Sequence, residues 1–251
     1  MIDDLIKQRC PYLTTIFKVD ELLEKNDDQY ALLRNVGFGA SDSSKLLGIN
    51  PYTTLNELLK EKRSLVPVKD EIKYKATVRK GRELEDLIMK KISKILEIEI
   101  YKPAIMYGYK DTRLTVNFDG VTPIDSYLIP VEIKLCTTYG RKYYDFRRAI
   151  TEDIKNPNFK VTLGELKLMG TRSPDMCGYP INYYSQLQQQ ILFLDAPFGI
   201  LGVLDDQNWT LELFLTYRDN EMIKDIQVAE VKHRWNLHSL NEIKSKIEEL
   251  A

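Results

Sequence analysis

The chain has 251 residues, of which 43% are hydrophobic and 29% charged, so it can bury a sizeable core as one globular unit. Its formal net charge is -1, which neither favours nor excludes a nucleic-acid partner, because only locally clustered basic residues would matter. Three dispersed cysteines and two histidines argue against a disulfide framework and against a histidine-built metal site. No apolar run approaches a membrane span and the start does not resemble a signal peptide, so we expect a soluble protein of the cytoplasm.

The first half of the chain reads as mainly helical, with a change of period near its end. Residues 1–33 are predicted to be a helical N-terminal segment, followed by a stretch with closely spaced glycines at 34–41. Further helices are predicted over 42–48, over 53–62 and within 71–97, the last interrupted at Gly81. The period then becomes two over 113–121 and 127–135, which predicts a β-hairpin.

The second half returns to helical spacing and ends in a tail. Residues 139–179 form a long mixed segment, and 182–194 have the spacing of a helix with one apolar face. A second strand pair is predicted over 199–204 and 209–218, and residues 221–251 form a charged helical tail. We expect a single domain over 1–251, with its core at about 30–205.

An acid and a lysine share one face of the strand at 127–135. Val131, Ile133 and Leu135 alternate with Glu132 and Lys134, so the two charged side chains point to the same side. Asp119, beside Gly120 in the preceding strand, approaches Glu132 if the strands pair. Two carboxylates beside a lysine suit a Mg²⁺ site for phosphodiester hydrolysis. The alternative is a cross-strand salt bridge on an exposed sheet.

A third acid lies on an apolar helix face. On a helical wheel of residues 84–96, Glu85 falls within the apolar stripe, whereas Glu83 falls on the opposite side. A carboxylate directed into a core is costly unless it is paired or bound to metal, so Glu85 is a candidate ligand, with a buried salt bridge as the alternative. Gln186 and Gln190 flank one edge of the apolar stripe of the helix at 182–194, and Gln188 flanks the other. Such neutral amides are candidates for contacts to a metal-bound water or phosphate. Ordinary surface glutamines are the alternative.

Two further features suit phosphate groups. Ser41 lies at a predicted helix start with Arg34 seven residues upstream, and such a start with an arginine binds anions. Simple helix capping is the alternative reading of Ser41. Basic residues also cluster in two windows, which consist of Lys73, Lys75, Arg79, Lys80 and Arg82, and of Arg141, Lys142, Arg147 and Arg148. Solvated helix faces are the alternative for these clusters.

Five motifs in order resemble the YqaJ-like viral recombinase nucleases, which include the lambda-type exonucleases of the PD-(D/E)XK superfamily. The similar segments are Gly37–Tyr52 with its Asn-Pro-Tyr end, Gly81–Glu85, Asn117–Gly120, Val131–Lys134 and Tyr184–Gln188. The resemblance implies an α/β fold in which a central mixed β-sheet is flanked by helices. It also implies metal ions, Mg²⁺ or in its place Mn²⁺, held by Glu85, Asp119, Glu132 and the backbone of Ile133.

The same resemblance carries expectations about DNA. It implies that Lys134 and Gln186 are catalytic, that Gln188 contacts DNA, and that Arg34 and Ser41 lie near a 5'-phosphate end. The expected activity is that of a phage-type exonuclease, which digests double-stranded DNA in the 5'-to-3' direction. It would produce single strands for an annealing protein. A ring of three identical subunits is a further expectation.

Alternatives remain open at this stage. One is a site-specific or Cas4-like endonuclease, although three dispersed cysteines do not match the four cluster ligands usual in Cas4-like proteins. Another is a non-catalytic DNA-binding or inhibitory protein on the same fold, which predicts at least one degraded position among the four catalytic candidates. None of the four is degraded.

Overall fold

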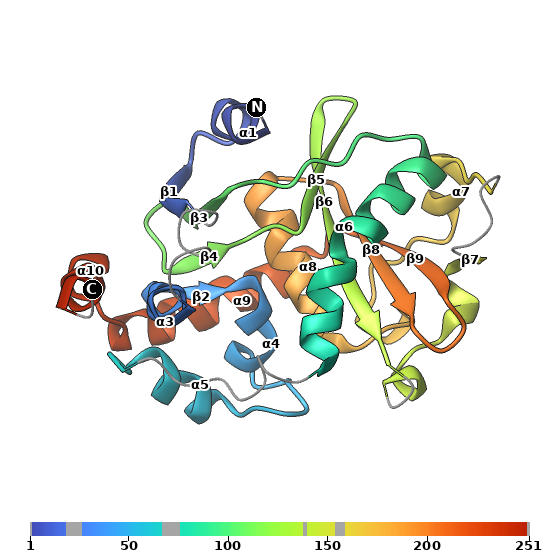
Figure 1. Ribbon diagram of the computed structural model, residues 1–251. Coiled ribbons are helices and arrows are strands. Elements are labelled where there is room, and N and C mark those ends of the chain that lie inside the picture. The colour runs from blue at the N-terminus through green and yellow to red at the C-terminus, as the bar shows by residue number, and fades with distance from the viewer. Residues whose placement is uncertain (1, 19–26, 67–75, 138–139, 154–158, 250–251) are drawn as a thin grey trace.

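The strands of the protein form two mixed β-sheets, and helices pack against them (Figure 1). The computed structural model describes residues 2–18, 27–66, 76–137, 140–153 and 159–249. The strands are β1 (Leu13–Lys18), β2 (Phe38–Gly39), β3 (Ile105–Tyr109), β4 (Leu114–Val116), β5 (Gly120–Ile124), β6 (Tyr127–Cys136), β7 (Ile150–Asp153), β8 (Phe198–Asp205) and β9 (Thr210–Tyr217).

The helices fall along the whole described chain. The α-helices are α1 (Ile2–Arg9), α3 (Asp27–Leu33), α4 (Ser43–Leu46), α5 (Leu55–Lys62), α6 (Ala76–Leu96), α7 (Leu163–Leu168), α8 (Ile181–Leu194), α9 (Asn220–His233) and α10 (Leu240–Glu249). The 3-10 turns are η1 (Arg34–Val36), η2 (Ala40–Asp42), η4 (Arg141–Tyr143), η5 (Phe146–Arg148), η6 (Pro174–Met176) and η7 (Arg234–Asn236). In the described residues no helix is long and apolar enough to cross a membrane.

The larger sheet has the order β5-β6-β8-β9-β7 and lies between two long helices. β6 and β8 run parallel, whereas β5–β6 and β8–β9 are antiparallel hairpins. A Cβ at Gly202 would meet Ile92 of α6 at 2.4 Å, and one at Gly199 would meet Leu187 of α8 at 2.7 Å. Since residues an odd number apart on a strand face opposite sides, α6 and α8 cover opposite faces of this sheet.

The smaller sheet has the order β1-β3-β4-β2 and corrects the prediction for the N-terminus. Residues 1–33 were expected to be helical, but Leu13–Lys18 form β1, paired antiparallel with β3. Thr14, Thr15 and Ile16 are β-branched and suit a strand, and pairing with a segment about 90 residues away decides the outcome. The tail does contain helices, and Ile243 of α10 packs with Leu32, Leu33 and Val36 in a separate small core.

Two further boundaries differ from the predictions. Helix α6 continues through Gly81 without interruption, because one glycine costs a helix only about 1 kcal/mol. The strand predicted over 113–121 is divided: β4 pairs in the smaller sheet, and β5 pairs with β6 in the larger one. Asp119 therefore lies at the point where the chain passes from one sheet to the other.

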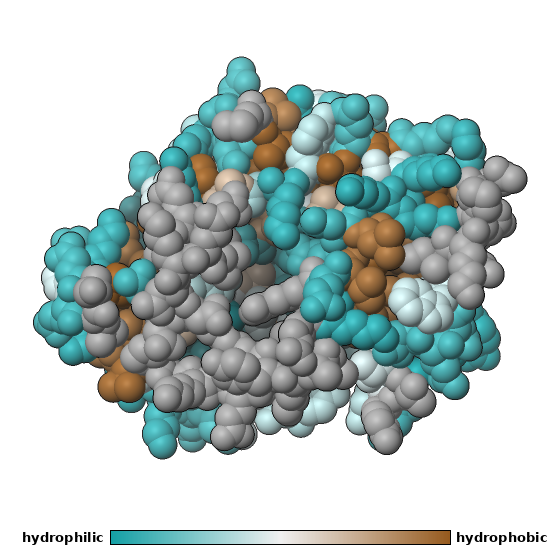
Figure 2. Space-filling model, in the orientation of Figure 1, coloured by the Kyte–Doolittle hydropathy of each residue, from teal (hydrophilic) through white to brown (hydrophobic). Residues whose placement is uncertain are grey.

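The surface agrees with the mixed composition. In the coloured part of the face shown in Figure 2, hydrophilic residues predominate, and hydrophobic residues appear as separate patches between them. Among the described residues, Trp235 and Leu168 are the most exposed large apolar side chains, at 84% and 87%. Isolated exposed residues of this kind are normal on a protein surface.

Gly37 is expected to be intolerant of a side chain. A Cβ at this position would lie 2.4 Å from the carbonyl oxygen of Arg113, a backbone atom that cannot move aside cheaply. We predict that Gly37→Ala lowers the free energy of unfolding by about 1 to 3 kcal/mol, measured by denaturant titration. The control is Gly164→Ala in α7, where the nearest atom is 3.7 Å away and alanine favours the helix. Equal stability of the two variants would contradict the prediction.

Candidate active site

Glu132 and Lys134 lie on one face of strand β6, as the alternation predicted. Helix α8 covers that face. Glu132 pairs in register with Leu201 of β8. Leu201 lies two residues after Gly199, which contacts α8, so both residues face this helix. Its side chain is 1% exposed, and both of its oxygens accept hydrogen bonds. Gln186 Nε2 donates to Oε1 and Gln190 Nε2 donates to Oε2, each at 2.5 Å, and Lys134 Nζ also contacts Oε1. The carboxylate is therefore held by donors from two elements.

Asp119 lies against this pair. Its Oδ2 accepts a hydrogen bond of 2.9 Å from the backbone N–H of Ile133, which fixes the carboxylate beside β6. Burial, and next the negative charge of Glu132, raise the pKa of Asp119 to about 7. Two carboxylates thus meet in a site where simultaneous ionisation is unfavourable without a positive charge.

Lys134 supplies one such charge. Burial alone would lower its pKa, but Glu132 and Asp119 together hold the pKa above the ordinary value for lysine. The ammonium also lies 5.2 Å from the centre of the Tyr183 ring, a cation–π contact from the start of α8. Lys134 therefore stays protonated and its position is fixed.

Glu85 approaches the same group from α6. Its side chain is 20% exposed and accepts a hydrogen bond of 2.8 Å from Lys102 Nζ. Burial and then the charge of Asp119 raise its pKa, so the two carboxylates influence one another. The salt-bridge alternative thus describes Glu85 in this structure.

The oxygen donors here suit a hard divalent cation. In the described ranges no three Asp, Glu, His or Cys side chains converge closely enough to form a ready-made metal site. Asp119 and Glu132 nevertheless form a buried carboxylate pair, and Gln190 Oε1 beside them is buried without a hydrogen-bond partner. Carboxylate and amide oxygens are ligands or water contacts typical of Mg²⁺ and Mn²⁺. The residues therefore fit such an ion.

The glutamines of α8 divide into separate roles. Gln188 is fully buried; its Nε2 donates to Tyr217 O at 2.9 Å and its Oε1 accepts from Asp219 N at 2.9 Å. Both ends of this amide are used between α8 and the end of β9. The geometry therefore gives Gln188 a packing role and does not support the predicted contact to DNA.

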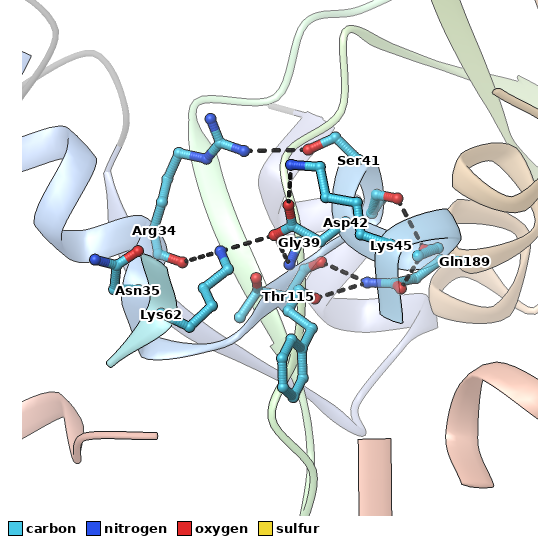
Figure 3. A network of polar contacts seen from close by, with 12 residues as sticks. Arg34, Asn35, Gly39, Ser41, Asp42, Lys45, Lys62, Thr115 and Gln189 are labelled. Carbon is cyan, nitrogen blue, oxygen red and sulfur yellow. Dashed lines mark hydrogen bonds and ion pairs between the residues drawn. The ribbon is translucent and has the colours of Figure 1, made fainter. Parts of the chain in front are cut away.

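Gln189 joins α8 to the segment with closely spaced glycines, as Figure 3 shows. Its Nε2 donates to the carbonyls of Phe38 at 3.0 Å and Thr115 at 2.8 Å. Its Oε1 accepts from Ser43 Oγ at 2.7 Å. One side chain thus connects β2, β4 and the start of α4 to the helix that holds Glu132.

Arg34 and Ser41 lie together at the edge of this network (Figure 3). Arg34 Nη2 donates to Ser41 Oγ at 3.1 Å. Behind them the fully buried Asp42 pairs with Lys62 Nζ at 2.7 Å and with Lys45 Nζ at 3.3 Å. Burial opposes ionisation of Asp42, but Lys62 and then Arg34 outweigh it and lower the pKa well below its usual range. The result is a rigid turn that presents a guanidinium and a hydroxyl.

The basic clusters are only partly described. Of the first window, Lys80 pairs with Asp206 at 3.1 Å, and the side chains of Lys73, Lys75, Arg79 and Arg82 lie outside the described residues. In the second, Arg141 pairs with Asp205, and Arg147 and Arg148 pair with Asp145. Acidic partners therefore compensate part of the positive charge.

Two participating residues were not predicted. Gln190 did have a signal, because its i, i+4 spacing from Gln186 puts both on one edge of the helix. Gln189 had no such signal, because its partners are backbone carbonyls from distant strands. Lys102 lies 17 residues after Glu85, and only the fold brings the two together.

The raised pKa of Asp119 predicts a stability effect. Its folded pKa of about 7 lies above the ordinary value for an aspartate, so its contribution is favourable at low pH and is lost as pH rises through 7. In metal-free protein, Asp119→Asn should therefore raise the free energy of unfolding by at least about 1 kcal/mol at pH 8, and by less at pH 5. Urea titrations with a chelator at both pH values test this. A variant less stable than wild type at pH 8 would refute it.

Comparison with known proteins agrees with this geometry. The model of the YqaJ-like viral recombinase domain matches residues 29–195. No curated protein sequence matches the chain. The fold is similar to the alkaline exonuclease LHK-Exo of Laribacter hongkongensis, with a TM-score of 0.52 and 14% identity over 89% of this chain and 99% of that one. LHK-Exo in complex with dAMP gives a TM-score of 0.52 and 16% identity over 88% and 95%.

At these identities the solved structures establish the fold alone. They confirm the expected mixed α/β architecture of the PD-(D/E)XK type, here with two sheets rather than one. The family model spans more than half of the sequence, including Arg34, the catalytic candidates and the glutamines of α8. The chain therefore belongs to the YqaJ-like viral recombinase domain family.

Proposed function

We propose that the protein is a metal-dependent deoxyribonuclease that digests double-stranded DNA from its 5' ends and leaves single strands for recombination. The main support for this proposal is the cluster of Asp119, Glu132 and Lys134, in which Gln186 and Gln190 donate to both oxygens of Glu132. Burying two acids beside a lysine is costly for folding, and such arrangements are typical of catalytic sites. Membership of the recombinase family supports the same reading.

Each side chain has a distinct role in this proposal. Asp119, Glu132 and the carbonyl of Ile133, with Glu85, hold the metal ions. Bound Mg²⁺ or Mn²⁺ supplies Lewis-acid stabilisation of the phosphate and a water of lowered pKa. Lys134 stays protonated and stabilises negative charge that develops on the phosphate. Gln186 and Gln190 donate to the two oxygens of Glu132 and so orient its carboxylate.

End recognition is assigned to Arg34 and Ser41. Their guanidinium and hydroxyl lie 3.1 Å apart, and the ion pair of Asp42 with Lys62 fixes the turn between them. An arginine beside a hydroxyl suits a terminal phosphate. This anchor supports 5'-to-3' polarity. A ring of three subunits and an annealing protein as partner remain part of the proposal.

The central experiment uses a linear duplex labelled at either end, digested beside a closed circle. We expect the wild type to digest the linear duplex with Mg²⁺ or Mn²⁺, to stop in excess chelator and to leave the circle intact. Glu132→Ala should lower the rate about a thousandfold or more, and Lys134→Ala should retain DNA binding while losing turnover. Glu85→Ala should also be inactive, whereas the matched control Glu83→Ala, exposed on the same helix, should not.

The outcomes separate the alternatives. Cleavage of circles at the rate of linear duplex would replace the exonuclease with an endonuclease. Binding of DNA without any hydrolysis would favour a non-catalytic DNA-binding protein. Undiminished hydrolysis in chelator, or a normal rate for Glu132→Ala, would overturn the metal assignment.

Arg34→Ala tests the anchor. Loss of a bidentate charged contact, worth about 1.5 to 3 kcal/mol, should reduce the preference for 5'-phosphorylated over 5'-hydroxyl ends about tenfold or more. The 5'-hydroxyl duplex is the internal control, on which variant and wild type should have similar rates. Equal rates of the wild type on both ends would contradict the anchor while leaving the nuclease intact.

A further inference from the structure

The Asn-Pro-Tyr motif at the end of the segment Gly37–Tyr52 has no role in the site described so far. In the structure Asn50 shapes this turn: its Oδ1 accepts from the backbone N–H groups of Tyr52 and Thr53, both at 2.9 Å. Its Nδ2 donates to Ser44 Oγ at 2.7 Å. The backbone at Tyr52 is thereby held in place, and the Tyr52 side chain is 67% exposed. A large exposed ring on an ordered turn suits contact with a ligand.

Tyr52 lines a cavity of about 130 Å³. Its walls are made by Tyr52, Leu135, Cys136, Thr137, Gly140, Tyr143, Tyr144, Pro180, Asn182 and Tyr183. Four of these are tyrosines, and no lining residue carries a charged side chain. The volume is well below the roughly 300 Å³ at which pockets for drug-sized ligands begin, so it suits a single planar ring system.

One polar atom in the wall lacks a partner. Asn182 Oδ1 is buried and accepts no hydrogen bond. Leaving such an acceptor buried and unpaired costs about 1 to 3 kcal/mol, and an N–H donor on a ligand would remove that cost. The cavity therefore combines aromatic walls with one unused acceptor.

The cavity adjoins the catalytic cluster. Leu135 and Cys136 directly follow Lys134 on β6, and Lys134 Nζ lies 5.2 Å from the ring of Tyr183, another wall residue. No wall residue is basic, so the pocket itself offers no positive charge for electrostatic capture of a phosphate.

We propose that this tyrosine pocket binds one unpaired nucleobase, belonging to a nucleotide within one position of the scissile phosphate, with Asn182 Oδ1 accepting an N–H of the base. Stacking on aromatic rings is sequence-tolerant, adenine, cytosine and guanine carry amino donors, and an unpaired thymine carries its N3–H, so the pocket serves processive digestion of any sequence. A base in the pocket cannot be paired, so the duplex end must open before cleavage. This placement of the base beside a cleaved phosphate rests on the proposed nuclease function.

A binding measurement tests the pocket without catalysis. The probes are dAMP and 2-deoxyribose 5-phosphate, titrated by calorimetry in the presence of chelator. The wild type should bind dAMP at least about tenfold more tightly than the sugar phosphate, because stacking on one aromatic ring alone supplies this factor. Tyr52→Ala and Asn182→Leu should each lose most of that difference. Tyr127→Ala, which removes a 46% exposed tyrosine at the other end of β6, is the matched control.

A second measurement places the pocket in the reaction. Duplexes with one abasic nucleotide at the first or second position from the 5' end are digested beside intact duplex. We expect one of the two to slow the wild type about tenfold, and Tyr52→Ala to digest intact and abasic duplex at similar rates.

The results overturn the two proposals separately. Equal wild-type rates on intact and both abasic duplexes, with Glu132→Ala inactive, would refute the pocket and leave the nuclease standing. Absence of all hydrolysis would refute the nuclease, while the calorimetry still decides whether a base binds. Equal affinity for dAMP and the sugar phosphate, or unchanged dAMP binding by Tyr52→Ala, would refute the base pocket in either case.

Discussion

The burial of the Glu132 carboxylate is the constraint on which the rest of the site depends. A carboxylate that is 1% exposed is tolerated only if donors replace its water, and Gln186, Gln190 and Lys134 do so. Two of these donors come from α8, so the helix must dock on β6 in one register and at one rotation. The apolar face of α8, which includes Leu187 and Ile191, is buried against the larger sheet and fixes that docking.

Helix α8 consequently links the cluster of Asp119, Glu132 and Lys134 to the turn that carries Arg34 and Ser41. Gln189, between the two residues that hold Glu132, bonds Phe38, Thr115 and Ser43 on the opposite flank. Successive side chains of a helix point about 100° apart, so neighbouring residues reach different partners. The distance from Arg34 and Ser41 to Glu132 is therefore set by one rigid helix rather than by a loop. Such rigidity suits an enzyme in which a bound end must present its scissile bond at a fixed place.

Charge within the site opposes folding stability. Burial, and next repulsion by Glu132, raise the pKa of Asp119. Asp42 shows the contrasting case, since Lys62 lowers its pKa and makes the buried pair favourable for its ionised form. The protein thus contains one compensated buried acid that shapes a turn, and one poorly compensated acid where chemistry is proposed. Strain of this kind concentrates at functional sites.

The sequence by itself determined the face shared by Glu132 and Lys134, the second strand pair and the apolar stripe of α8, because periods of two and 3.6 are local properties. It also identified the family, through motifs whose order survives low identity. The sequence did not determine β1, the division of the strand at Asp119, or the roles of Gln188, Gln189 and Lys102. Each of these depends on a partner far along the chain, such as β3 for β1 and the backbone of Thr115 for Gln189. Only tertiary structure decides such pairings, since the same side chain would be an ordinary surface group without its distant acceptor.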